Sequence, residues 1–191
     1  MSKKNYLAQF AKSFNWAGFF LPKNVYQDCS KLYAFCRVLD DIVDEKSNLE
    51  LRIKRINEIK NIFNKTYELD NNDRNEMDES EHSIIVNDVI ILADKYNIKR
   101  IILDDLIEGV SSDLKKKVHL RSVKDLLVYS YRVAGSVGLM MAKILNVSDT
   151  RSLKGAIDLG IAMQLTNISR DVVEDLKSGR SYINENFDEI K

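Results

Sequence analysis

The segment YAFCRVLDDIVDE, residues 33–45, places four carboxylates within six positions of an otherwise apolar stretch. An α-helix turns about 100° per residue, so side chains three, four and seven positions apart share one face. One face of the predicted helix borders its apolar side and carries Tyr33, Arg37, Asp40 and Asp44. Asp41 and Glu45 point further round the helix, where we expect them to face solvent.

A second stripe of this kind lies in DLGIAMQLTNISRDVVEDLKSGRSYI, residues 158–183. Four polar side chains line up there within about 40° of Asp171 on a helix. They are Gln164, Asn167, Asp171 and Asp175. Carboxylates four positions apart repel each other, so each pair needs a compensating reason. A solvated helix face explains one such pair, whereas two copies beside apolar surface make a cation site an equally good explanation.

Paired carboxylates of this kind suit a hard divalent cation. Mg²⁺ keeps several of its waters and is often shared between one or two carboxylates and the phosphates of a substrate. Asn167 and Gln164 could add neutral oxygen ligands, and the guanidinium groups of Arg37 and Arg170 fit phosphate oxygens. The sequence contains no Walker loop or glycine-rich dinucleotide fingerprint that would bind phosphate instead. A helical metal-binding or scaffold protein is the alternative.

The elements that must position these groups are helices. The 191-residue chain has one proline and seven glycines, and its apolar residues recur at helical spacing almost throughout. We predict an all-α single domain over residues 1–191, with a polar loop at 68–81. The predicted helices cover residues 3–14, 22–45, 48–67, 82–96, 99–115, 122–145 and 150–177.

Composition excludes several classes of protein. The formal net charge is zero, which argues against a nucleic-acid partner. The two cysteines, Cys29 and Cys36, lie on one predicted helix and indicate a reducing compartment rather than a disulfide framework. We find no signal-peptide core and no apolar stretch of about 20 residues that could span a bilayer. A cytoplasmic protein is therefore expected, with peripheral membrane contact left open.

Four segments, taken in order, resemble the squalene/phytoene synthases, the head-to-head branch of the trans-prenyltransferases. Besides the two acidic stripes, KSFNWAGFFLP (12–22) is similar to the family's S-F-x-x-A…L-P, and YSYRVAGSVG (129–138) to its Y-x-x-x-V-A-G-x-V-G. The second stripe continues into a G-R-x-Y pattern ending at Tyr182. The resemblance implies an isoprenoid-synthase-type helical bundle around a central apolar cavity, with both aspartate motifs at its mouth.

The resemblance also assigns roles to single residues. Those implied to bind Mg²⁺, or Mn²⁺ in its place, are Asp40, Asp44, Asn167, Asp171 and Asp175. Those implied to hold the diphosphates or prenyl chains are Ser13, Phe14, Tyr33, Val133, Gly138, Gln164, Asn167, Arg170 and Arg180. Arg37 and Tyr129 join the four aspartates as catalytic groups.

The implied reaction joins two C20 geranylgeranyl diphosphates head to head, through a cyclopropyl diphosphate, to phytoene. Squalene or dehydrosqualene synthesis from two C15 diphosphates is the close alternative, and a non-catalytic assembly or lipid-binding factor is another. Such a factor would be expected to lose a motif aspartate, whereas all four are present here. The family's final helices have no counterpart in this sequence, so we expect a homodimer or a membrane surface to complete the cavity.

The small residues of VAGSVG support either of two packing arrangements. Glycine in mid-helix costs roughly 1 kcal/mol relative to alanine, so Gly135 and Gly138 need a reason to be there. They allow close approach either of a neighbouring helix or of a long prenyl chain.

Overall fold

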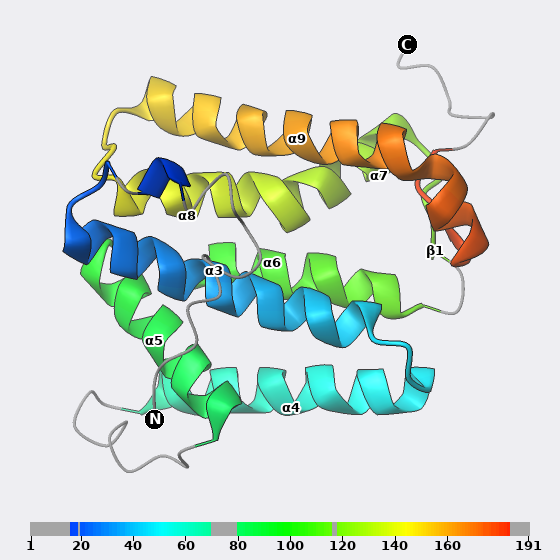
Figure 1. Cartoon of the computed structure of the whole chain (residues 1–191), viewed down its shortest axis with the longest axis horizontal. Helices are drawn as coiled ribbons and strands as arrows, with labels where there is room; N and C mark the ends of the chain where they lie inside the picture. The colour runs from blue at the N-terminus through cyan, green and yellow to red at the C-terminus, as the bar shows by residue number, and fades with distance from the viewer. Residues whose placement is uncertain (1–15, 19, 70–79, 116–117, 184–191) are drawn as a thin grey trace. The chain divides into compact units, whose positions relative to one another are not determined.

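The computed structural model describes residues 16–18, 20–69, 80–115 and 118–183. Most of these residues are helical, which confirms the all-α prediction (Figure 1). The chain forms two compact units, Met1–Ile98 and Lys99–Lys191, called unit 1 and unit 2 below. The single domain over 1–191 stays a prediction, and the expected helix at 3–14 lies outside the described residues.

Unit 1 is built on three helices: α3 (Lys23–Asp44), α4 (Leu49–Glu68) and α5 (Glu81–Lys95). Each begins and ends within about two residues of its predicted bounds. The three pack against one another, and α3 runs beside α4 in Figure 1. Their shared core includes Leu32 and Phe35 of α3, Phe63 of α4 and Ile90 of α5, all at most 1% exposed. The acidic stripe of α3 is thus carried on a well-packed helix.

Asp28 is a buried charge that ties α3 to the end of α5. Its Oδ2 accepts hydrogen bonds from Lys95 Nζ at 2.6 Å and from Tyr96 Oη at 2.7 Å. Burial raises the pKa of Asp28, but these bonds and the charges of Lys95 and Lys31 outweigh it, and the net pKa lies below its ordinary value of 3.8. A group with a depressed pKa stabilises the fold above its unfolded pKa and loses that contribution as the pH falls.

We therefore expect Asp28→Asn to lower the free energy of unfolding by about 1.5–3 kcal/mol at pH 7, the range for hydrogen bonds to a charged group. The difference from wild type should shrink as the pH falls from 4 through the folded pKa of Asp28. Urea unfolding at pH 7 and at pH 3 measures both. An equal loss at the two pH values would contradict this role.

Unit 2 contains the following elements: α6 (Arg100–Ser111), the 3₁₀ turn η2 (Ser112–Leu114), β1 (Val118–His119), α7 (Val123–Ser130), the π-helical turn η3 (Tyr131–Gly135), α8 (Ser136–Ile144), α9 (Thr150–Lys177) and β2 (Arg180–Ser181). The helix predicted at 122–145 is thus one run of α7, η3 and α8 with a π-helical centre. Asp149 caps the N-terminus of α9, since its side chain accepts a hydrogen bond from the Ser152 amide at 2.8 Å.

The sequence did not predict the parallel pair of β1 and β2, in which Val118 pairs with Arg180 and His119 with Ser181. Two-residue strands are too short to show alternation. Gly179 has φ of 80°, a left-handed conformation that favours glycine, and it turns the chain from the end of α9 into β2.

Glycines let α9 lie directly against the α7–η3–α8 run, which it accompanies in Figure 1. A Cβ at Gly160 would collide with the carbonyl oxygen of Ala134, and one at Gly138 with the carbonyl oxygen of Ala156. Gly135 faces α9 as well. These contacts support the helix-packing explanation of VAGSVG, and the predicted contact of Gly138 with substrate stays a prediction.

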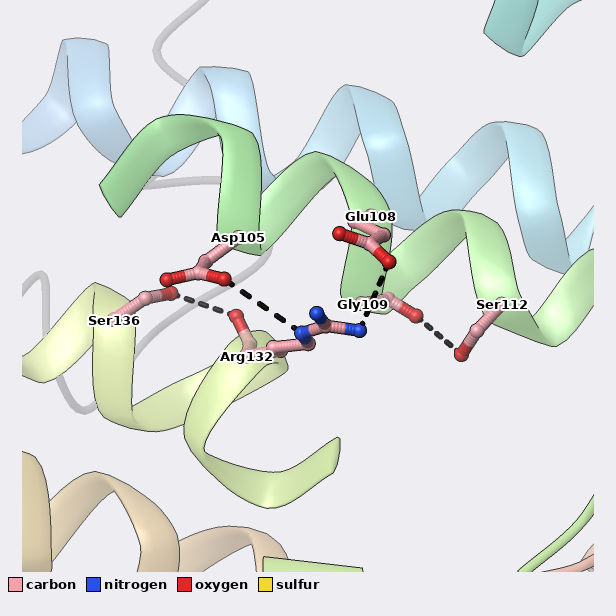
Figure 2. Close-up of polar contacts among 6 residues, drawn as sticks. All are labelled: Asp105, Glu108, Gly109, Ser112, Arg132 and Ser136. Carbon is pink, nitrogen blue, oxygen red and sulfur yellow. Dashed lines mark hydrogen bonds and ion pairs between the residues drawn. The ribbon is translucent and has the colours of Figure 1, made fainter. Parts of the chain in front are cut away.

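Arg132 fastens the π-helical turn to α6 (Figure 2). Its Nη1 donates to Glu108 Oε1 at 3.0 Å, and its Nε lies 3.6 Å from Asp105 Oδ1. Ser136 Oγ donates to the Arg132 carbonyl at 2.7 Å. Gly109 makes the close approach feasible, because a Cβ there would lie 2.7 Å from Arg132 Cβ. The irregular centre of this long helix is therefore held by specific contacts.

Candidate functional site

The first acidic stripe runs along the C-terminal half of α3, where Asp40 and Asp44 are both exposed. The other two acids of the segment are paired with arginines: Asp41 with Arg37 at 2.6 Å, and Glu45 with Arg55 of α4. Asp41 is exposed, as expected, whereas Glu45 is half-buried beside Arg55. Arg37, expected beside Asp40 and Asp44, is paired with Asp41. The roles of Asp40 and Asp44 stay predictions.

These contacts set the charge states of the stripe. Burial lowers the pKa of the Arg37 guanidinium, but the hydrogen bond and charge of Asp41 outweigh it, so the pKa is raised. Burial raises the pKa of the Tyr33 hydroxyl, and the nearby charge of Asp40 adds to this effect although Arg37 opposes it. The stripe therefore presents a cation and a neutral phenol beside its carboxylates, a combination suited to an anionic ligand bound with a metal.

The second stripe lies on α9, where Gln164, Asp171 and Asp175 are half-buried and Asn167 is exposed. Arg170 donates two hydrogen bonds to Asp171, from Nε to Oδ1 at 2.7 Å and from Nη2 to Oδ2 at 2.6 Å. This pairing lowers the pKa of Asp171 and raises that of Arg170. Because Arg170 is 68% exposed, solvent screens its ion pair with Asp171.

Asp175 shares a shallow pocket at the end of α9 with Arg180. The side chains that line it are Ile168, Val172, Asp175, Leu176, Arg180, Ser181, Tyr182 and Ile183. The Gly179 turn and the pairing of β2 with β1 carry Arg180 back toward the helix. A predicted metal ligand and a predicted diphosphate ligand thus lie in one pocket, with apolar residues on its walls.

Tyr129 is buried and bound to two residues that sequence reasoning did not nominate. Its hydroxyl lies 2.8 Å from Asp113 Oδ2 and 3.2 Å from the Tyr182 hydroxyl, which lies 2.9 Å from Asp113 Oδ1. The two rings stack with centroids 4.9 Å apart. The G-R-x-Y pattern could have indicated Tyr182 as a site residue. Nothing in the sequence indicated Asp113, since it belongs to no periodic pattern.

Burial raises the pKa of both phenols, and the negative charge of Asp113 raises it further. A group whose pKa is higher in the folded than in the unfolded protein stabilises the fold fully below its unfolded pKa, here 10.0, and loses that contribution as the pH rises. Both tyrosines thus remain protonated at neutral pH.

Above pH 10 we expect the stability of unit 2 to fall by up to about 1.4 kcal/mol per pH unit for each of these tyrosines. The Tyr129→Phe/Tyr182→Phe double variant should show a shallower fall. The measurement is the slope of the unfolding free energy against pH between pH 9 and pH 11.5. The slope is compared because the double variant also loses hydrogen bonds, which changes its stability at every pH. Parallel slopes in the two proteins would contradict the expectation.

The remaining predicted site residues are placed as follows. Val133 is half-buried and packs against the apolar cluster around Tyr129 and Ile168. Gly138 lies against α9, and Ser13 and Phe14 lie outside the described residues. In the described ranges, no three acidic, histidine or cysteine side chains come together as a preformed metal site.

The donor set still fits Mg²⁺. Each stripe offers two carboxylates one helical turn apart, and α9 adds the amide oxygen of Asn167 one turn earlier. Hard oxygen donors of this kind bind Mg²⁺ together with substrate phosphates, without a closed all-protein cage.

The sequence profile of the family described as squalene/phytoene synthase matches residues 7–186. The chain belongs to the squalene/phytoene synthase family. This match spans both acidic stripes, and it confirms the family that the four motifs indicated.

Two curated members of the family illustrate the relationship. The chain is 34% identical to a 15-cis-phytoene synthase of Paracoccus sp. over 181 residues, and 33% identical to the 15-cis-phytoene synthase of Pantoea ananas over 185 residues. Each alignment covers 93% of this chain and 57% of the relative. The chain therefore spans little more than half the length of these relatives.

Solved structures agree on the fold. A dehydrosqualene synthase crystal structure superposes with a TM-score of 0.64 at 29% identity, covering 94% of this chain and 58% of that one. A squalene synthase of Alicyclobacillus acidocaldarius superposes with a TM-score of 0.71 at 21% identity, over 90% of this chain and 60% of that one, and shows likeness of fold alone.

Proposed function

We propose that this family member is a Mg²⁺-dependent prenyltransferase that condenses two geranylgeranyl diphosphates to phytoene, in carotenoid biosynthesis. The observation that carries the proposal is the presence of both D-x-x-x-D stripes on helices, in a chain whose curated relatives include phytoene synthases. All four motif aspartates are retained, which argues against a non-catalytic assembly or lipid-binding factor.

For this reaction the protein must stabilise a leaving diphosphate and protect a carbocation from water. Bound Mg²⁺ would neutralise charge on the departing diphosphate. The aspartates would orient the diphosphate through that ion, while Arg37, Arg170 and Arg180 supply charge-assisted hydrogen bonds to its oxygens. Arg37 and Arg170 would have to exchange their present partners, Asp41 and Asp171, for the ligand.

Two ionisations follow each other. The C–O bond of one allylic diphosphate breaks, the 2,3 double bond of the second substrate attacks the resulting cation, and loss of a proton gives a cyclopropylcarbinyl diphosphate. That intermediate loses its own diphosphate, rearranges and releases a proton to give the 1-1′ product. Apolar walls would keep water from both cations.

The deciding experiment is incubation of the purified protein with C15 and C20 diphosphates and Mg²⁺, followed by chromatographic identification of products. Phytoene from the C20 substrate is expected. Dehydrosqualene from the C15 substrate, or squalene when NADPH is added as hydride donor, would favour the alternative, which the likeness to a dehydrosqualene synthase supports. No product from either, with wild type and Asp40→Ala and Asp171→Ala variants behaving alike, would refute the enzyme proposal for this chain.

A partner surface is the second part of the proposal. α9 exposes three large apolar side chains, Leu159 (63%), Val173 (67%) and Leu176 (56%), and exposed apolar surface is a feature of interaction sites. No helix in the described ranges has the length and apolar character needed to cross a membrane. We propose homodimer formation or peripheral membrane contact, and a monodisperse monomer by light scattering, active without lipid or detergent, would contradict it.

A further inference from the structure

A half-buried carboxylate joins three segments of unit 2 that lie far apart in the sequence. Asp113 in η2 accepts hydrogen bonds from Tyr129, in the last turn of α7, and from Tyr182, the residue after β2. Both phenols are buried, at 7% and 6% exposure. Their surroundings are apolar, with Val118 and Ile168 in the same cluster.

The charge of Asp113 decides where the two phenol protons point. A carboxylate next to an apolar cluster costs free energy unless hydrogen bonds compensate its lost hydration. Each phenol has one proton, and Tyr129 and Tyr182 each donate a hydrogen bond to a different oxygen of Asp113, at 2.8 Å and 2.9 Å. Tyr129 and Tyr182 are therefore held as donors to Asp113, and each hydroxyl oxygen retains only acceptor capacity.

The network also fixes the position of β2. Tyr182 follows the strand directly, and Arg180 is the strand residue paired with Val118. With Tyr182 anchored to Asp113 at one end and the Gly179 turn at the other, Arg180 is confined to the pocket that it shares with Asp175.

We infer that Asp113 is a positioning residue: by binding the hydroxyls of Tyr129 and Tyr182, it sets the strand that presents Arg180 beside Asp175. The effect of this positioning on diphosphate binding rests on the proposed function. The link between Asp113 and the two tyrosines, which consists of their hydrogen bonds, does not.

The link is tested by NMR of protein labelled with ¹³C at tyrosine Cζ, because this carbon senses the hydrogen bond of the phenol. Signals are assigned with Tyr129→Phe and Tyr182→Phe. Asp113→Asn should move the Tyr129 and Tyr182 signals. Asp104→Asn should leave them unchanged, since Asp104 forms an ion pair with Arg100 one helical turn away on α6. Unchanged signals in Asp113→Asn would overturn the inference whatever the activity.

The consequence for Arg180 is tested with inorganic pyrophosphate and Mg²⁺ in titration calorimetry. Asp113→Asn should weaken binding by about 10-fold to 100-fold in the wild-type background, the range for losing a hydrogen bond to a charged group. In an Arg180→Ala background it should have no further effect, because both changes remove the same contact. An equal loss in both backgrounds would mean a merely structural role and would overturn the positioning of Arg180.

Failure of the inference can be distinguished from failure of the proposed function. Wild-type protein without affinity for pyrophosphate would refute the diphosphate site and the Arg180 step with it, while the tyrosine spectra still decide the link. If Asp113→Asn does not fold, Tyr182→Phe replaces it, since it removes one hydroxyl only. The same pyrophosphate titration then decides: a loss in the wild-type background alone supports the inference, and a loss in both contradicts it.

Discussion

Asp171→Asn is expected to lower the rate of product formation by about 100-fold or more. The carboxylate is proposed to hold a divalent cation on the departing diphosphate, and such charge stabilisation is worth several kcal/mol, about tenfold per 1.4 kcal/mol. The substitution also releases Arg170 from its two hydrogen bonds with Asp171. Because a freed guanidinium can still bind diphosphate, the Michaelis constant for the prenyl substrate should change much less than the turnover rate.

The matched control is Asp158→Asn, an exposed aspartate on the same helix and outside the polar stripe. It removes the same charge from α9 and should leave turnover within about twofold, as expected for a screened surface charge. Product formation by both variants is measured at increasing Mg²⁺ concentrations. Excess Mg²⁺ should partly restore the rate of Asp171→Asn, because it fills a weakened metal site. Equal losses in Asp158→Asn and Asp171→Asn would refute a specific role for Asp171.

Gly160→Ala is expected to destabilise unit 2 by up to about 2 kcal/mol. The new methyl group would meet the backbone carbonyl of Ala134, which cannot move aside as a side chain can. Overpacking of this kind costs up to about 3 kcal/mol, against a gain of about 1 kcal/mol for alanine over glycine in a helix. A decrease in melting temperature of up to roughly 4–8 °C should follow for a chain of this size.

Gly155→Ala on the same helix is the control, because no atom lies within 4 Å of a Cβ placed there. It should raise stability by about 0.4–1 kcal/mol. Thermal unfolding monitored by circular dichroism compares the two variants directly. If both variants gained stability, the close approach of α9 to η3 would be wrong.

The helices were largely predictable because their signals are local. The apolar period of α3 and the cap of α9 at Asp149 each depend on residues within a few positions of one another. The pairing of Asp171 with Arg170 and of Asp41 with Arg37 was open to the same reasoning, since the partners are one and four positions apart. Helix geometry also predicts which acids in residues 33–45 share a face, whereas the pairing of Glu45 with Arg55 joins two helices.

The β1–β2 pair and the Asp113 network were not predictable in this way. Asp113 meets Tyr129 across 16 positions and Tyr182 across 69. No periodicity links such residues, and two-residue strands carry too few side chains to show alternation. Packing of η2, α7 and β2 within unit 2 creates these contacts.

The amino-acid sequence by itself determined which side chains share a helix face, because the helical turn is a property of the local backbone. It thereby led to the prediction of paired carboxylates with arginines for a phosphorylated ligand. The tertiary structure alone decided what each group contacts: Gly138 packs against the backbone of α9, and Tyr129 donates a hydrogen bond to Asp113. Those outcomes depend on segments distant in the chain, which only the folded core brings together.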